Sequence, residues 1–371
     1  TKPNQTLRHY RLLSSSSSFN SIQSNPIQSN SQFVFSLQIP LGFFISIAFQ
    51  FLQMEVKRRT VSTLVSRLSS VSEQTRCESL SELRLMTKND VESRSLIVEA
   101  GALPYLSETL YSSSHVAQED AAATLLNLSI SSRQALMSTH GLLDAISHVL
   151  SHHNSSSSAS AVQSCGATLH SLLVVDEYRP IIGSKRDIIY SLVDILKYRK
   201  SPQRSIKDAL KALFGIALHQ SNRSTMVDLG VIPPLFSLVV VGGHAGIVED
   251  ASAVVAQVAG CEESELAFRR VSGLGVLVDL LDSGTGSSLR TKENAVSALL
   301  NLAKWGGDRA AEDVKDLGSG ILSEIADVAV NGSEKGKTKA VELLKMVASG
   351  GIDGNVFEDL QLNRLINPCS E

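Results

Sequence analysis

The sequence predicts an all-α protein built from stacked helical repeats, and three observations support this prediction. One apolar helix pattern recurs along the chain at intervals of 42 to 45 residues. A glycine followed by another apolar helix recurs between these copies at the same period. Residues 56–350 also lack the sustained alternation of apolar and polar side chains that half-buried strands show. A fixed period of this size is typical of solenoids, in which each unit buries its apolar face against the next.

The first 53 residues differ in composition from the rest of the chain. They contain three basic residues, no carboxylate, a serine run at 14–18 and an uncharged apolar run at 33–52. The first methionine is Met54, so we expect translation to start there. Residues 1–53 would then be a low-complexity extension that is disordered or not native. Two alternatives remain open: the apolar run is a membrane anchor or signal, or the basic, serine-rich start is an organellar transit peptide.

The recurring helix begins with small residues, has leucines at helical spacing and carries a polar residue near its end. Its copies lie at 79–87, 121–129, 165–173, 209–217, 251–259, 295–303 and 340–348. The pattern is apolar on more than one side, so neighbours must pack against both flanks of each helix. We therefore expect about seven repeats of about 43 residues over 56–350, followed by a C-terminal tail at 351–371.

The glycine motif defines the rest of each repeat. Its copies lie at 99–110, 139–150, 228–239, 271–281 and 316–329. Glycine tolerates the left-handed backbone that ends a helix, so the expected order is a short first helix, a glycine turn, a second helix, a polar loop and a third helix. One repeat lacks the glycine, and the segment 185–197 takes the place of the motif there.

Composition excludes several classes of function. The net charge is −3, so the composition does not show the excess of basic residues that is typical of nucleic-acid-binding proteins. Its four cysteines stand far apart, which predicts no metal site, no disulfide framework and a cytoplasmic or nuclear location. The segment 332–338 resembles a phosphate-binding loop but has one residue too few between its glycines. We therefore expect no enzymatic activity and no cofactor.

The three-helix unit, with glycine before helix two and asparagine late in helix three, resembles the armadillo repeat over roughly residues 60–350. The segments SLIVEAGALPYL at 95–106 and AAATLLNLSI at 121–130 are most similar to the armadillo portion of plant U-box/armadillo proteins. The resemblance implies a right-handed superhelix whose third helices line a concave groove. It further implies that another protein, or an extended peptide segment, binds in this groove through the helix-three asparagines.

An asparagine amide suits this role because it offers a donor and an acceptor side by side, matching one peptide unit. The column of equivalent positions reads Leu85, Asn127, Ser171, Gly215, Gln257, Asn301 and Met346. Only two members are asparagine, and glutamine is a plausible substitute for it. The expected groove residues are Asn127, Ser171, Gln257, Asn301 and Trp305. The alternatives are that both asparagines are structural amides that tie helix three to its own loops, and that the tryptophan is a packing residue.

The function predicted from these features is a non-catalytic protein-binding scaffold or adaptor. The alternative is a component of ubiquitin ligation related to the plant U-box ligases, serving as the substrate-recognition part without its own U-box. A U-box is a separate globular domain, and residues 1–53 lack the charged, turn-rich composition of such a domain. We expect no nucleic-acid partner, and membrane attachment only if residues 33–52 are a genuine anchor.

Overall fold

The computed structural model describes residues 41–241, 243–317 and 321–348, and every regular element in these ranges is a helix. The all-α prediction is therefore confirmed. The chain divides into two compact units, Thr1–Leu52 and Gln53–Glu371. Helix α1 (Leu41–Arg67) continues through Met54 without a break. Residues 1–40 of the expected extension, and the expected tail at 351–371, lie outside the described residues.

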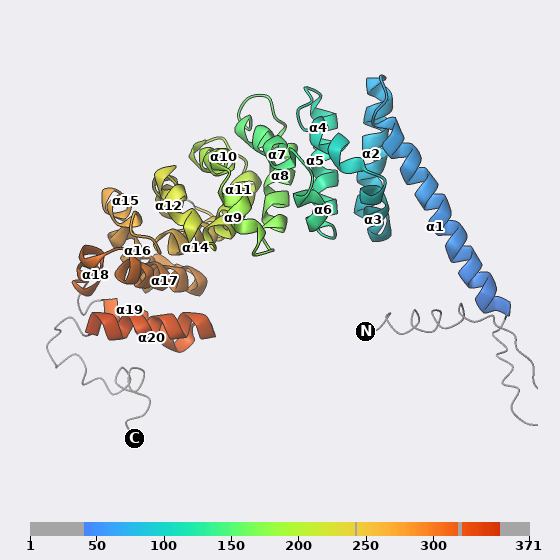
Figure 1. Cartoon of the computed structure of the whole chain (residues 1–371). Coiled ribbons are helices and arrows are strands. Elements are labelled where there is room, and N and C mark those ends of the chain that lie inside the picture. Colours follow the sequence, from blue (N-terminus) through green and yellow to red (C-terminus); the bar gives the residue numbers. More distant parts are fainter. Residues whose placement is uncertain (1–40, 242, 318–320, 349–371) are drawn as a thin grey trace, which may run out of the picture. The chain divides into compact units, whose positions relative to one another are not determined.

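Beyond α1, the helices follow one another in groups of three (Figure 1). The first helices are α3 (Val91–Glu99), α6 (Arg133–Met137), α9 (Tyr178–Gly183), α12 (Ser221–Asp228), α15 (Ser264–Arg270) and α18 (Asp308–Lys315). The second helices are α4 (Ala102–Thr109), α7 (Leu142–Ser151), α10 (Arg186–Lys197), α13 (Ile232–Val241), α16 (Gly273–Leu281) and α19 (Leu322–Asn331). The third helices are α2 (Glu73–Asn89), α5 (His115–Ser129), α8 (Ala159–Leu172), α11 (Gln203–Ala217), α14 (Ala245–Val258), α17 (Leu289–Trp305) and α20 (Glu334–Ala348).

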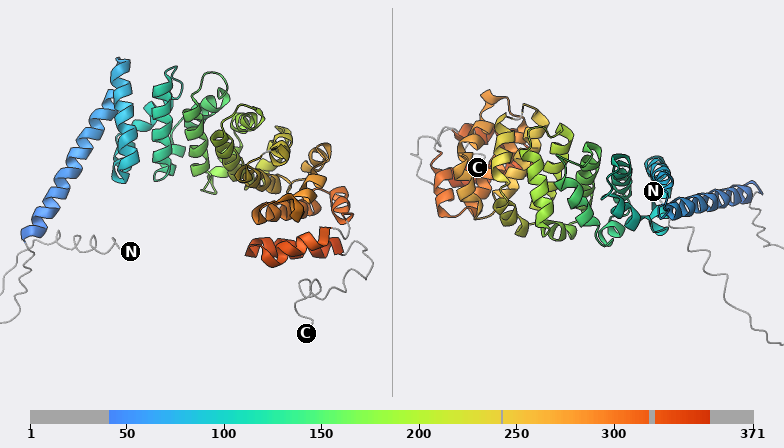
Figure 2. Two further views of the ribbon diagram at one scale, coloured as in Figure 1. Left: turned by 180° about the vertical axis from the view of Figure 1, so that it is seen from behind. Right: turned by 90° about the horizontal axis from the view of Figure 1, so that it is seen from above.

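The third helices form a continuous row, because each one packs against the next from α2 to α20 (Figure 2). Equivalent apolar residues two positions before the predicted amide column are at most 1% exposed: Leu125, Leu169, Leu213, Val255, Leu299 and Leu344. Burying these side chains on both flanks of each helix drives the stacking, since a lone repeat would leave them in water. The core thus runs along the stack.

Three of the predicted glycine turns between first and second helices are confirmed. Gly101, Gly141 and Gly230 adopt a left-handed backbone, with φ between 76° and 80°, within two residues of the start of the second helices. The glycines of the last predicted copy, at 318 and 320, lie outside the described residues. At the turn before α16 the prediction is wrong. Ser272 takes the left-handed conformation, with φ 52°, while Gly273 is the first residue of α16. A Cβ atom at Gly273 would lie 2.8 Å from Phe236 Cζ, so this glycine is needed for close packing.

In the described part of the chain, no single helix has the length and apolar character to cross a membrane. The pair α12 and α13 passes that test only when both helices are taken together, and they are bent by 78° relative to each other. The described portion of the apolar run at 33–52 is part of α1, and residues 33–40 lie outside the described residues.

Candidate protein-binding face

The predicted groove residues lie near the C-terminal ends of four third helices. Asn127 is on α5, Ser171 on α8, Gln257 on α14, and Asn301 on α17, and each is half-buried. Trp305 is the last residue of α17 and is 53% exposed. No hydrogen bond joins any two of these side chains within the described residues. The packing of successive third helices nevertheless places them along one row, which we call the third-helix face.

The two asparagine amides are oriented by the preceding third helix. Asn301 Nδ2 donates to the carbonyl oxygen of Ala256 at 2.7 Å. Asn127 Nδ2 donates to Thr87 Oγ1 at 3.1 Å, and this hydroxyl donates its own hydrogen to the carbonyl of Arg84. Each partner atom can therefore only accept, so the Nδ2 end of each amide must face the preceding helix. Both amides therefore make structural contacts, as the alternative interpretation expects, but the hydrogen bonds are to the preceding third helix and not to the loops of their own repeat.

This orientation leaves part of each amide available to a ligand. Among the described residues, neither Asn127 Oδ1 nor Asn301 Oδ1 accepts a hydrogen bond, and neither atom is buried. Each Nδ2 also has a second hydrogen. A fixed amide with a free acceptor and a free donor is suited to bonding the C=O and N–H of an approaching main chain.

The other two polar residues of the column also contact neighbouring helices. Ser171 Oγ donates to the carbonyl of Ser129 at 3.1 Å, at the end of the preceding third helix. Gln257 Oε1 accepts from Arg223 Nη2 of α12 at 3.4 Å. The Gln257 side chain is therefore partly occupied by a first-helix arginine.

A close approach of α8 and α11 explains why the column is interrupted at Gly215. A Cβ atom at this position would lie 2.8 Å from Leu173 Cβ. Two turns away along the same interface, a Cβ at Gly166 would lie 3.3 Å from Asp208 Cβ. No amide-bearing side chain fits at position 215 without separating the two helices.

An exposed apolar row accompanies the amide column, and we did not predict it. Three positions after the column residue, Ile130, Val174 and Leu218 are 52%, 57% and 36% exposed. Trp305 lies at nearly the same place in its repeat, four positions after Asn301. The recurrence of an apolar residue just beyond the third helix was a signal in the sequence. The third-helix face thus combines oriented amides with accessible apolar side chains.

A second recurring feature, also not predicted, is a row of half-buried arginines on the first helices. Arg94, Arg179 and Arg223 each donate Nε to a carbonyl near the C-terminal end of the preceding third helix, at 2.8, 3.1 and 2.9 Å. Arg133 instead donates to the carbonyl of Ser171 in the following third helix, at 2.8 Å. Cations suit these carbonyls because the negative end of the helix dipole lies there. Burial lowers the pKa of Arg223 from its usual value.

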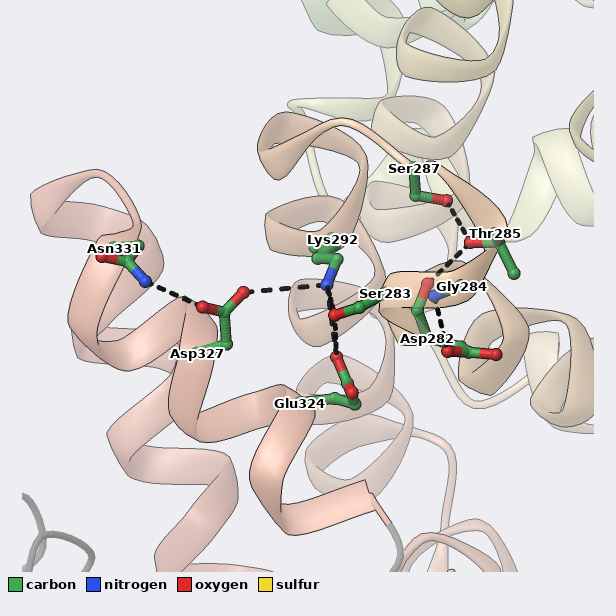
Figure 3. Close-up of polar contacts among 9 residues, drawn as sticks. All are labelled: Asp282, Ser283, Gly284, Thr285, Ser287, Lys292, Glu324, Asp327 and Asn331. Atoms are coloured by element: carbon green, nitrogen blue, oxygen red, sulfur yellow. Dashed lines mark hydrogen bonds and ion pairs between the residues drawn. The ribbon is translucent and has the colours of Figure 1, made fainter.

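Lys292 lies on the side of α17 opposite Asn301, in a polar cluster where carboxylates neutralise its charge (Figure 3). Its ammonium donates to Ser283 Oγ at 2.8 Å and lies 3.2 Å from Glu324 Oε2 and 3.7 Å from Asp327 Oδ2. The side chain is only 7% exposed. Its charge is balanced by two carboxylates of α19, so the cluster ties α17 to the second helix that follows it.

Residues 60–358 match the family model of the plant U-box protein ARM repeat region. The chain belongs to this family. The predicted resemblance to the armadillo portion of plant U-box proteins is thereby confirmed, and so is the expected α-solenoid.

Curated relatives share this ARM region with the chain. U-box domain-containing protein 16 of Arabidopsis thaliana is 30% identical over 302 residues, covering 79% of this chain and 41% of the relative. U-box domain-containing protein 19 of the same plant is 29% identical over 298 residues, covering 79% and 43%. The chain therefore spans about two fifths of the length of these relatives.

Solved structures agree with the fold. An engineered protein matches with a TM-score of 0.65 and 25% identity over 78% of this chain and 68% of its own. A chain from a structure described as "A conserved phosphorylation switch controls the interaction between cadherin and beta-catenin in vitro and in vivo" matches with a TM-score of 0.63 and 17% identity. It covers 78% of this chain and 55% of the other. The second likeness concerns the fold alone.

Proposed function

We propose that this ARM-repeat chain is a non-catalytic protein-binding module that holds an extended segment of another protein along its third-helix face. The observation that carries the proposal is the orientation of the Asn127 and Asn301 amides, whose Oδ1 atoms are left free by contacts to the preceding helix. The exposed apolar row beside them supplies area for the partner's side chains. Polar groups would fix the segment's register, and apolar contacts would add affinity.

The test begins with affinity capture by the full chain, identification of the partner by mass spectrometry and titration with the purified partner. A hydrogen bond contributes about 1 kcal/mol, and up to about 3 kcal/mol when its loss leaves a buried group unpaired. Asn301→Ala should therefore weaken the partner about five- to a hundredfold. Unchanged affinity would show that the partner does not bind at this amide.

A control is needed because Asn301→Ala also removes a bond between α17 and α14. Asn222→Ala is matched to it: this buried amide donates Nδ2 to the carbonyls of Arg179 at 3.0 Å and Ile216 at 2.9 Å. Asn222 is 4% exposed, so it offers nothing to a ligand. The control should lower stability and leave the affinity unchanged at temperatures where circular dichroism shows a folded chain. An equal loss of affinity in both variants would attribute the effect to stability.

The second candidate function is substrate recognition in ubiquitin ligation, which the names of the curated relatives favour. A reconstituted reaction with activating enzyme, conjugating enzyme, ubiquitin and a separate U-box protein, run with and without the purified chain, separates the two candidates. If the chain is a scaffold alone, adding it should leave ubiquitin conjugation of its captured partner unchanged. Conjugates on the partner that form only when the chain is present would favour substrate recognition, and conjugates formed without the U-box protein would overturn the non-catalytic assignment.

A further inference from the structure

At the C-terminal end of the third-helix face, Lys339 of α20 is a half-buried cation without a carboxylate partner. Its ammonium donates to Ser297 Oγ of α17 at 3.0 Å. Within the described part of the chain, no carboxylate oxygen lies within ion-pair distance of it. Lys292, on the opposite side of α17, is by contrast balanced by two carboxylates. The two lysines differ in how far the protein compensates their charge.

The surroundings of Lys339 add positive charge. Burial is the largest cause that lowers its pKa, and Lys335 and Lys304 lower the pKa further, while Glu293 opposes them. The nearby carboxylates are already engaged. Glu293 accepts from the backbone N–H and the hydroxyl of Ser333, and Glu342 pairs with Lys304 at 2.5 Å. Together α17 and α20 carry seven basic and three acidic side chains.

Helix geometry places these lysines on the third-helix face. With 3.6 residues per turn, Lys335 and Lys339 lie one turn apart on the same side of α20. On α17, Ser297, Asn301 and Lys304 likewise share one side, and Ser297 contacts Lys339. Lys304, Lys335 and Lys339, which we call the lysine cluster, are therefore continuous with the predicted binding residues Asn301 and Trp305.

We propose that the lysine cluster binds an aspartate- or glutamate-rich segment of the partner protein. This inference rests on the proposed function and names the chemistry of the partner at one end of the face. A half-buried ammonium without a counter-ion is unfavourable, so a carboxylate delivered by a ligand supplies a charge that the fold leaves out. Complementary charge also fixes the direction of the bound segment, with its acidic part toward α20.

The test uses the full chain and a short fluorescein-labelled peptide of alternating aspartate and serine. Two control peptides have asparagine or lysine in place of aspartate. Binding is followed by fluorescence anisotropy, and the emission of Trp305, the chain's single tryptophan, reports on the adjacent surface. We expect the aspartate peptide to bind more tightly than both controls, with an affinity that falls as salt is added. Equal or tighter binding of either control peptide would overturn the proposal.

Variants locate the site. Lys339→Gln should weaken the aspartate peptide about tenfold or more, because a charge-assisted contact is lost. Lys337→Gln is the matched control: it removes the same charge from the same helix, but its side chain projects from the opposite side of α20. Its effect should be less than about twofold, because the charge of Lys337 lies on the opposite side of α20 from the bound peptide and acts on it only at long range. Equal losses in both variants would overturn the proposal.

This failure can be told apart from failure of the proposed function. If Asn301→Ala weakens the captured partner while the aspartate peptide does not bind, the third-helix face holds partners by other chemistry and only the lysine cluster is misassigned. If Asn301→Ala has no effect and the aspartate peptide still binds through Lys339, the lysine cluster stands and the amide assignment is wrong.

Discussion

Ser272 offers a sharp test of the turn geometry, because it is the single non-glycine residue with positive φ in the described ranges. A left-handed backbone costs an L-residue about 1–2 kcal/mol. Glycine removes this cost but loses about 0.5–1 kcal/mol of conformational entropy on folding. The Ser272 side chain is exposed and makes no capping bond to α16, so replacing it removes no hydrogen bond to that helix. Ser272→Gly should therefore stabilise the α15–α16 turn by about 0.5–1 kcal/mol.

The mirror substitution is Gly141→Ser. Gly141 precedes α7 with φ 76°, and no atom lies within 4 Å of where its Cβ would be, so only backbone strain is added. It should destabilise its turn by about 0.5–1 kcal/mol. Repeat arrays open locally, so the measurement is amide hydrogen exchange of the two turns, supported by urea denaturation. A Ser272→Gly chain with a lower opening free energy, or a Gly141→Ser chain with a higher one, would refute the reasoning.

Two further predictions concern the core between α8 and α11. Gly215→Ala should destabilise the chain by about 1–3 kcal/mol in urea denaturation, because its Cβ would lie 2.8 Å from Leu173 Cβ. Leu173→Gly removes the clashing Cβ, so the double variant should lose less stability than the sum of the two single variants, and simple additivity would contradict the proposed clash. Burial raises the pKa of Cys165 to about 12, so its thiolate is scarce at neutral pH. Iodoacetamide should modify Cys165 last among the described cysteines in peptide mapping of the native chain, and equal rates would contradict its burial.

Much of the fold was predictable because the signals are local and repeated. The helix pattern around Leu125 and Leu299 recurs at a fixed period, and these residues are buried at equivalent places in the stack. Glycine turns at Gly101 and Gly230 were predictable for a similar reason, since few other residues accept positive φ. At Ser272 this reasoning failed. The neighbouring Gly273 packs closely against Phe236, and Ser272 adopts the positive φ in its place.

The candidate site was only partly predictable. The sequence placed Asn127 and Asn301 at equivalent positions in two repeats, but not the partners of their amides, which lie 40 and 45 residues earlier in the chain. The balance of charge around Lys339 likewise depends on Ser297, Lys304 and Glu342, which distant packing brings together or holds apart.

The sequence by itself determined the class of helix, its period and the stacking of one repeat on the next. These properties follow from apolar side chains spaced along a single helix, which must be buried wherever the chain goes. Only the tertiary structure decided which ends of the amides stay free and which lysine lacks a counter-ion. Hydrogen bonds and ion pairs depend on the distance between atoms of different repeats, and that distance exists only after the repeats have packed.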